Sequence, residues 1–251
     1  MKIRVIGETL LDKYVFWDNT GKVDPATLVP VYTYKKTTEV PGGAGNLVKV
    51  LSDSNRDNIL FTTNTINVPV KERHYCDSDP IMRVDIGDYI EHDDSVVSDF
   101  ITSIETGDVV VVSNYHKGFL IENDIKKIIQ VSKTFGATTF IDTNKVTPHY
   151  YDVDYLKINQ KTYYESDVNF NKFDSLVVTK GSDGCSIYNK GEYTQVQQKN
   201  HPMMPVADSI GAGDSFFAGF ISSILTGMDI ESSCNFANSI AYLSCRTLGT
   251  I

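Results

Sequence analysis

The apolar and polar residues of this chain follow two periods, one typical of buried strands and one typical of amphipathic helices. Short apolar runs rich in Val, Ile and Phe predict buried strands, and apolar residues spaced three or four positions apart predict helices. Strands that alternate with helices indicate βαβ units around a mostly parallel sheet. The predicted strands are residues 2–7, 59–62, 109–113, 137–141 and 175–179, and the predicted helices are residues 44–52, 94–105, 121–135, 213–226 and 230–246.

Three further segments depart from this alternation. Residues 28–40, 70–75 and 81–86 place apolar and polar side chains alternately, as half-exposed strands do. We expect them to form a small antiparallel sheet that projects from the main body, as a lid built from about residues 12–40 and 68–88. Because the chain has no internal repeat and no long linker, residues 1–251 are predicted to form a single α/β domain.

Composition then narrows the classes of partner. The formal net charge of −9 argues against a nucleic acid or an anionic membrane as the main partner. No apolar run approaches the ~20 residues that span a bilayer, and residues 1–7 resemble a first strand more than a signal peptide. The four cysteines are widely scattered, so we expect reduced thiols in a cytoplasmic protein.

The most informative motif is Asp-Ser-Ile-Gly-Ala-Gly-Asp at residues 208–214, directly before a predicted helix. Two glycines allow a tight turn with uncovered N–H groups, and the positive end of a helix attracts phosphate. Asp214 follows this turn, where it can take a proton from a hydroxyl, and a carboxylate at a helix start is expected to stay ionised near neutral pH. The motif favours phosphoryl transfer to an alcohol, but a glycine turn with a capping Asp explains these seven residues equally well.

Two other glycine clusters stand at residues 42–46, Gly-Gly-Ala-Gly-Asn, and at residues 179–184, Thr-Lys-Gly-Ser-Asp-Gly. Neither spells the dinucleotide fingerprint or the P-loop, so a Rossmann enzyme and a P-loop NTPase are both disfavoured. Taken alone, residues 179–184 are best explained as a simple hairpin turn after a strand.

Together and in this order, the three clusters resemble the signatures of the ribokinase-like (PfkB) family of carbohydrate kinases. Within that family the chain is most similar to the D-glycero-β-D-manno-heptose 7-phosphate kinases. The resemblance implies a three-layer α/β/α fold with a mostly parallel sheet and a β lid over the sugar site. It also implies a kinase part without the nucleotidyltransferase domain of some heptose kinases, and a homodimer formed through the lid. The similar stretches are residues 7–14, 29–31, 41–46, 71–75, 83–85 and 113–118, with Asn238 and residues 248–250.

The resemblance also assigns roles to residues at the reacting groups. Asp214 would be the general base, and Gly211, Ala212 and Gly213 would donate N–H bonds to the transferring phosphate. For an existing phosphate on the sugar, Lys117 is the best candidate cation. Lys71, Arg73 and Arg83 are weaker candidates, because solvated strand charges explain them more simply.

On the sugar side, the resemblance places Asp12, Gly42, Gly43 and Asn46. A carboxylate and an amide can bracket neighbouring hydroxyls, although turn and helix capping explains Asp12 and Asn46 as well. On the nucleotide side, Asn238 alone would be an ordinary helix residue. The residues expected against ATP and its Mg²⁺ are Asn159, Thr162, Thr179, Gly181, Gly184 and Asn238.

The chain departs from the family pattern at several places. Asp142-Thr143-Asn144-Lys145 stands for the Asp-Pro-Lys of the heptose kinases, Glu8 replaces the usual Asp, and two further departures bear on the metal and the fold. The usual Asn-x-x-Glu is Asn159-Gln160-Lys161-Thr162 here, so the acidic residue that organises Mg²⁺ is replaced and the metal ligand is unknown, although Glu165 lies one helical turn further on. The segment after Leu60 is short, so one strand–helix unit is expected to be missing.

We therefore expect an ATP-dependent kinase that phosphorylates a sugar phosphate, foremost D-glycero-D-manno-heptose 7-phosphate at C1. Another PfkB sugar or nucleoside kinase is one alternative. A catalytically degenerate binding protein that keeps the nucleotide fold is the other.

Overall fold

The computed structural model describes residues 1–54, 58–77, 79–197 and 207–246. Its main sheet has eight strands in the order β12-β11-β10-β9-β8-β7-β1-β4. The strands from β4 to β10 run parallel, and β11 runs antiparallel to both of its neighbours. The strands are β1 (Ile3–Gly7), β4 (Ile59–Thr63), β7 (Val109–Asn114), β8 (Thr138–Thr143), β9 (Tyr155–Asn159), β10 (Ser175–Thr179), β11 (Cys185–Asn189) and β12 (Glu192–Val196).

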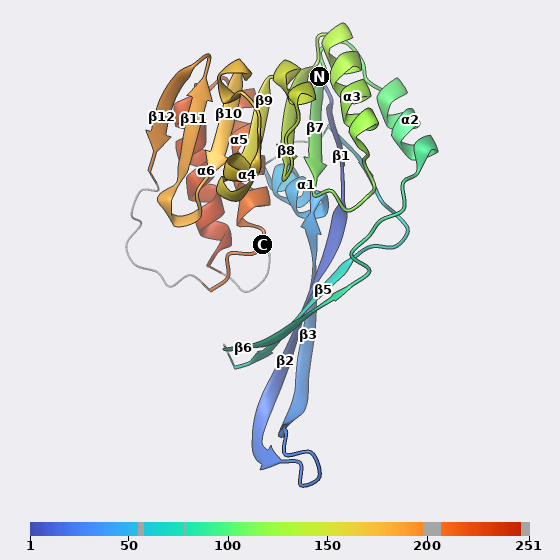
Figure 1. Cartoon of the computed structure of the whole chain (residues 1–251), viewed down its shortest axis with the longest axis vertical. Helices are drawn as coiled ribbons and strands as arrows, with labels where there is room; N and C mark the ends of the chain where they lie inside the picture. Colours follow the sequence, from blue (N-terminus) through green and yellow to red (C-terminus); the bar gives the residue numbers. More distant parts are fainter. Residues whose placement is uncertain (55–57, 78, 198–206, 247–251) are drawn as a thin grey trace.

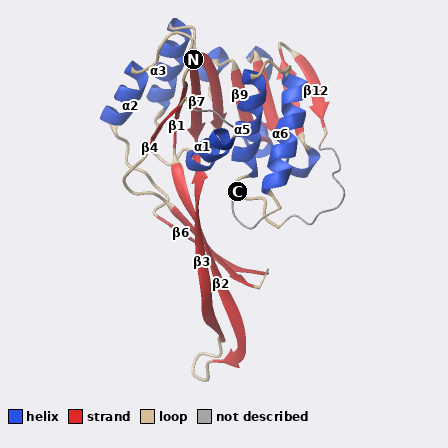
Figure 2. Cartoon of the chain, turned by 180° about the vertical axis from the view of Figure 1, so that it is seen from behind, coloured by secondary structure: helices blue, strands red, loops and turns tan. Residues whose placement is uncertain are grey.

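Helices cover both faces of this sheet, which confirms the predicted α/β/α layering. Helices α2 and α3 lie on one face in Figure 1, and α1, α5 and α6 lie on the other face in Figure 2. Strand β7 shows why: Val110 and Val112 join the core cluster beneath α2 and α3, whereas Val109 and Val111 join the cluster beneath α1 and α5. The helices are α1 (Ala44–Asp53), α2 (Asp94–Thr102), α3 (Glu122–Thr134), α4 (Gln160–Glu165), α5 (Ala212–Leu225) and α6 (Ile230–Ser244).

A second sheet projects from the body as the lid (Figure 1). It has four strands in the order β3-β2-β5-β6, where the sequence predicted three antiparallel ones. The omitted strand is β2, which forms a long hairpin with β3 and pairs parallel to β5. Both β2 and β5 leave the body in the same direction, because β5 follows β4 of the main sheet, and this fixes the parallel pairing. The lid strands are β2 (Thr9–Val23), β3 (Pro30–Gly43), β5 (Val70–Cys76) and β6 (Asp79–Ile86).

The predicted strands and helices all occur, with bounds within a few residues of those expected. The segment between β8 and the 208–214 motif holds elements that the pattern did not reveal, namely β9, α4, β11, β12 and the short 3₁₀ helices Pro148–Asp152, Phe170–Lys172 and Gly181–Asp183. Within the part of the chain that the structure describes, no helix has the length and apolar character needed to cross a membrane.

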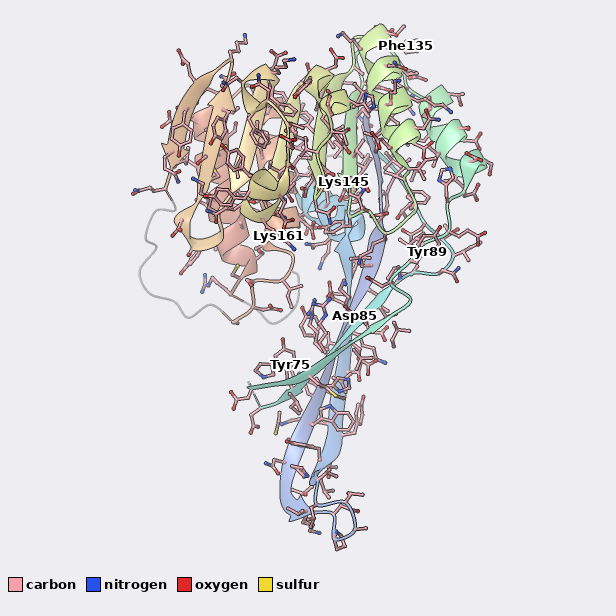
Figure 3. All side chains as sticks on the ribbon, viewed as in Figure 1. Tyr75, Asp85, Tyr89, Phe135, Lys145 and Lys161 are labelled. Atoms are coloured by element: carbon pink, nitrogen blue, oxygen red, sulfur yellow. The ribbon has the colours of Figure 1, made fainter. Side chains whose placement is uncertain are left out.

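The lid faces the edge of the sheet where the parallel strands end. In Figure 3, Lys145 and Lys161 lie at this edge and Asp85 lies on the lid below them, whereas Phe135 lies at the opposite end of the body. In open α/β sheets ligands bind at the carboxyl ends of the strands. We therefore expect a ligand site between this edge of the sheet and the lid.

Candidate active site

The glycine motif forms the first turn of α5. Gly211 is the N-cap of this helix and has a positive φ of 76°, a conformation that glycine adopts without steric cost. Its carbonyl accepts the N–H of Ser215 at 2.9 Å, and the N–H of Ala212 bonds Ser209 O at 3.3 Å. The following N–H groups, of Gly213 and Asp214, belong to the first helical turn, whose donors have no partner within a helix. The turn therefore points donors at one spot, as the sequence predicts for an anion site.

Asp214 lies in the first turn of α5 and is only 5% exposed. One carboxylate oxygen accepts the hydroxyl of Tyr115, and the other lies 3.4 Å from Asn46 Nδ2. Burial raises the pKa of this carboxyl to about 7, and the hydrogen bond from Tyr115 acts in the opposite direction. The expectation of a fully ionised carboxylate at neutral pH is therefore wrong, because desolvation outweighs the local effect of the helix N-terminus.

Asn46 connects this turn to the start of α1. It is the third residue of α1, whose N-cap is Gly43, so the capping alternative for Asn46 does not hold. Its Nδ2 atom donates to Gly211 O at 3.3 Å. Within the described part of the chain, its Oδ1 atom is buried without a hydrogen-bond partner. A buried acceptor without a partner is costly, and a hydroxyl donated by a ligand would satisfy it.

Asp12 lies in β2 and is 4% exposed, so it does not cap a turn. Its carboxylate accepts a hydrogen bond from Arg73 at 3.0 Å. The carboxylate also packs on the backbone of Gly42, where a Cβ atom would come within 2.4 Å of Asp12 Oδ2. Gly43 follows at the start of α1, so the structure brings Asp12, both glycines and Asn46 to one end of the lid hairpin.

Four cations gather where the lid meets the body. Lys117 bonds Asp88, and Lys71 lies 3.8 Å from the same carboxylate. The pKa of Lys71 is lowered, first by burial and also by the nearby charges of Arg83 and Lys117. Lys117, the cation predicted to bind a phosphate, therefore lies near three lid residues. The sequence favoured solvated strand charges as the explanation of these three, Lys71, Arg73 and Arg83. The ion pairs are Lys117–Asp88, Lys71–Asp88, Lys71–Asp85, Arg83–Asp85 and Arg73–Asp12.

On the predicted nucleotide side, Thr179, Gly181 and Gly184 lie in the turn that joins β10 to the antiparallel β11. The hairpin explanation of this motif is therefore correct as a description of its backbone. The turn sits at the carboxyl end of β10, next to that of β9, and Thr179 Oγ1 donates to Ile158 O at 3.3 Å.

Asn159 and Thr162 form the start of α4. The side chain of Asn159 caps this helix by accepting the N–H of Thr162 at 2.8 Å, and Thr162 is buried. Glu165 is exposed and lies 3.8 Å from Lys161, so it does not replace the missing acidic residue. Within the residues that the structure describes, no group of three or more His, Cys, Asp or Glu side chains is arranged to hold a metal ion.

Asn238 lies on α6, is 5% exposed, and has a buried Nδ2 atom that no described residue bonds. An amide donor left without a partner is what a nucleotide base or ribose oxygen would satisfy. Residues 248–250, which the resemblance also included, lie outside the described residues.

Two features of the site were not predicted. Lys157 of β9 donates to Asp142 of the neighbouring β8 at 2.7 Å, and its ammonium would lie 3.4 Å from a Cβ on Gly213. This buried ion pair is therefore at the α5 turn. The contact was not predicted because β9 itself was not predicted.

The second feature is Glu8, whose carboxylate is fully buried. It accepts the backbone N–H groups of Tyr115, Lys117 and Phe119 at 2.7, 2.8 and 3.2 Å. Burial raises the pKa of Glu8, and these hydrogen bonds lower it. Glu8 thus fixes the loop that delivers Tyr115 and Lys117 to the site, a role that no sequence spacing revealed.

Comparison with known proteins identifies relatives of this site. Residues 166–251 match the model of the pfkB family carbohydrate kinases. The bifunctional protein HldE of Aeromonas salmonicida is 24% identical over 302 residues, and that of Helicobacter pylori is 25% identical over 300 residues. Each alignment covers 99% of this chain, which spans 61% and 64% of the two relatives.

Solved structures share the fold at lower identity. Phosphofructokinase-2 from Escherichia coli superposes with a TM-score of 0.73 at 13% identity, covering 99% of this chain and 94% of that one. Ribokinase from Thermotoga maritima superposes with a TM-score of 0.70 at 15% identity, covering 100% and 94%. The ribokinase-like fold with its lid is thereby confirmed.

Proposed function

We propose that this chain, which belongs to the PfkB family of ribokinase-like carbohydrate kinases, phosphorylates a sugar phosphate, foremost D-glycero-D-manno-heptose 7-phosphate at C1. The observation that supports this most directly is the position of Asp214. It is a buried carboxylate at a glycine turn, beside an Asn46 oxygen that lacks a partner in the described chain. The distant similarity to the HldE proteins supports the heptose in particular.

Asp214 is the proposed general base. Its pKa of about 7 lies near the operating pH, where a base both exists in its ionised form and holds a proton well. The proton of the acceptor hydroxyl passes to the carboxylate oxygen on the Asn46 side while the sugar oxygen bonds the γ-phosphorus of ATP. The bond from that phosphorus to the bridging oxygen breaks, and ADP leaves. Asp12 and Asn46 orient the sugar by accepting hydrogen bonds from its hydroxyls, Asp12 through its carboxylate and Asn46 through Oδ1.

The turn at Gly211–Gly213 and the ammonium of Lys157 are proposed to bind the transferring phosphoryl group. Backbone N–H groups and a fixed cation stabilise charge in a water-poor site without reorganising. Lys157 is held in place by Asp142 at 2.7 Å, so it would meet the phosphate already oriented.

The site fits a nucleotide better than it fits a protein-bound metal. Asn238 Nδ2, which no described residue bonds, and the Gly181 and Gly184 turn after Thr179 would hold ATP, which supplies the phosphoryl group when bound. For Mg²⁺ the donor set does not fit: Thr162 has no charge, and Glu165 is exposed at the far end of α4.

The cluster of Lys71, Arg83 and Lys117 is proposed to bind the phosphate that the sugar already has. These cations are held by Asp85 and Asp88, and an entering phosphate would exchange places with these carboxylates. Arg can bind such a phosphate with two hydrogen bonds, and Lys acts as a point charge. This arrangement favours a phosphorylated sugar over ribose or a nucleoside.

We further propose a homodimer that forms through the lid. The outer strand β6 is exposed along its length, and an unpaired edge strand with apolar side chains readily pairs with another chain. The exposed apolar residues of β6 are Ile81, Met82, Val84 and Ile86.

We also propose a cytoplasmic location. The four cysteines are free thiols, as reducing conditions would leave them.

The test is ADP release by the purified protein with ATP and a panel of sugars, nucleosides and sugar phosphates. We expect the highest kcat/KM with the heptose 7-phosphate. A higher value with another acceptor would favour a different PfkB kinase. ATP binding without ADP release for any acceptor would favour the degenerate binding protein, for which the replacement at Thr162 is the supporting observation.

A further inference from the structure

We propose that Tyr115 is a positioning residue for the phosphoryl transfer: its hydroxyl holds one carboxylate oxygen of Asp214 so that the other faces the acceptor hydroxyl. This inference rests on the proposed function and assigns a role to a residue outside the glycine motifs. Tyr115 Oη donates a hydrogen bond to Asp214 Oδ1.

The backbone around Tyr115 is held from two directions. Its N–H bonds the buried Glu8 carboxylate at 2.7 Å, and its carbonyl accepts Asn144 Nδ2 at 3.0 Å. Its ring edge packs on Gly43, where a Cβ would lie 3.4 Å from Tyr115 Cε2. The phenol therefore reaches the base from a fixed support, between the sugar side and the α5 turn.

The two oxygens of Asp214 face different partners. Oδ1 accepts the Tyr115 hydroxyl, and Oδ2 lies 3.4 Å from Asn46, the residue whose own Oδ1 is unsatisfied by the described chain. Oδ2 is therefore on the side where an acceptor hydroxyl would enter. A carboxylate that is free to rotate would lose this distinction between its oxygens.

The hydroxyl of Tyr115 keeps its own proton throughout. Burial raises the pKa of Tyr115 well above its ordinary value, and the negative charge of Asp214 raises it further. The proton on Asp214 after transfer therefore comes from the sugar hydroxyl. Its O–H bond breaks as its oxygen bonds the γ-phosphorus, and the bond from that phosphorus to the departing ADP breaks. Tyr115 stabilises the ionised base as a donor, which lowers the pKa of Asp214 against the effect of burial.

Other charges also face this pair and contribute to the titration. Asp142 of β8 raises the pKa of Asp214 and Lys157 of β9 lowers it, while Asp12 of β2 acts on Tyr115. All of them are unchanged when only the Tyr115 hydroxyl is removed, so a Tyr115→Phe variant isolates one hydrogen bond.

We expect Tyr115→Phe to lower kcat about tenfold, the size expected for one hydrogen bond to a charged group. The acceptor KM should change less than about threefold, because the hydroxyl contacts the base and not the sugar. The acidic limb of the kcat/KM profile should move to higher pH by about one unit, since the ionised carboxylate loses a donor. Tyr151→Phe is the control, because the Tyr151 hydroxyl accepts the N–H of Asn169 at 2.9 Å, in the segment before β10, and its acidic limb should stay in place.

Incorporation of 3-fluorotyrosine at position 115 gives the opposite test and keeps the packing. Its more acidic phenol is a stronger donor, so the acidic limb should move to lower pH. The carboxyl of Asp214 should show the same two shifts in an NMR titration without any substrate. Unmoved limbs and an unmoved carboxyl titration in both variants would overturn the proposal.

The same NMR titration separates this inference from the proposed function. If the wild-type protein phosphorylates no acceptor in the panel, the proposed function fails, and with it the role in transfer. If the wild-type protein is active but the titration of Asp214 ignores both changes at position 115, only the positioning role fails.

Discussion

Two buried aspartates, one in the body and one in the lid, show how this fold gives the same side chain different chemistry. Asp12 of β2 is 4% exposed and is paired with Arg73 at 3.0 Å, whereas Asp214 of α5 is 5% exposed and meets a hydroxyl and an amide. Among the described residues, no cation forms an ion pair with Asp214. A neutralised carboxylate can bind hydroxyls as a constant acceptor, and one without a counter-charge can exchange a proton near neutral pH. Charge compensation, more than burial, distinguishes these two carboxylates, and in the proposed function it separates sugar binding from proton transfer.

Removing each negative charge in turn is the most direct test of the difference between Asp12 and Asp214. Asp214→Asn should lower kcat by at least about 10²-fold, because the reaction loses its proton acceptor. Asp12→Asn should act mainly on the acceptor KM, because it weakens sugar binding and leaves the base intact. Steady-state kinetics on both variants test this, and equal effects on kcat would contradict the division of roles.

The second change concerns the cation at the α5 turn. Lys157→Met should weaken ATP binding about tenfold more than ADP binding, because only ATP presents a γ-phosphate to that ammonium. Lys161→Met is the control, since Lys161 is on the neighbouring α4 and its side chain is 79% exposed. Calorimetric titration with each nucleotide gives the ratio of affinities.

A structural role for Lys157 would be revealed by removing its partner as well. If the ammonium only neutralises Asp142, the double variant Lys157→Met with Asp142→Asn should recover the wild-type ratio, because no buried charge is left unpaired. If the ammonium binds phosphate, the double variant should keep the defect.

The third change addresses the lid cations. Lys117→Met should raise the KM for the sugar phosphate about tenfold and leave the KM for the same sugar without its phosphate nearly unchanged. Lys126→Met, at an exposed position of α3, is the matched control. A parallel rise for both sugars would mean that Lys117 does not read the phosphate.

The smallest expected effect is on stability. The folded pKa of Asp214 is about 7 and its ordinary value is 3.8, so the folded state favours the protonated carboxyl. This contribution is complete below pH about 4 and is lost as the pH rises through about 7. Asp214→Asn should therefore gain a few degrees in Tm relative to the wild type between pH 5 and pH 8.5. A Tm difference independent of pH would contradict the raised pKa.

The sequence was most informative where the chemistry is local. Gly211, Gly213 and Asp214 lie within one turn, so their spacing already indicated the anion site at the start of α5. The core strands were recognised from their Val and Ile runs, because a strand buried on both faces is apolar throughout. Strand β2 was missed because a long hairpin that leaves the body has neither an apolar run nor a clean alternation along all of its length.

The contacts of Asp214 with residues distant in sequence could not be predicted from local spacing. Tyr115 and Asp214 are 99 residues apart in the chain, and their contact depends on Glu8, β7 and α5 meeting at one sheet edge. The helix start alone predicted an ionised carboxylate, while the raised pKa of Asp214 comes from burial by segments distant in sequence. Likewise, Lys157 and Asp142 meet only because β8 and β9 pair in parallel register.

The hydroxyl of Tyr14 in the lid strand β2 donates to Asp208 at 2.9 Å, and Asp208 in turn accepts the N–H of Ile210 at 3.0 Å. The first residue of the glycine motif is thus hydrogen-bonded to a lid residue that lies 194 positions away in the sequence. A lid from another sugar kinase, grafted onto this body to change its acceptor, must therefore keep a matching phenol at position 14. Without it, the turn that is proposed to bind phosphate would lose its alignment.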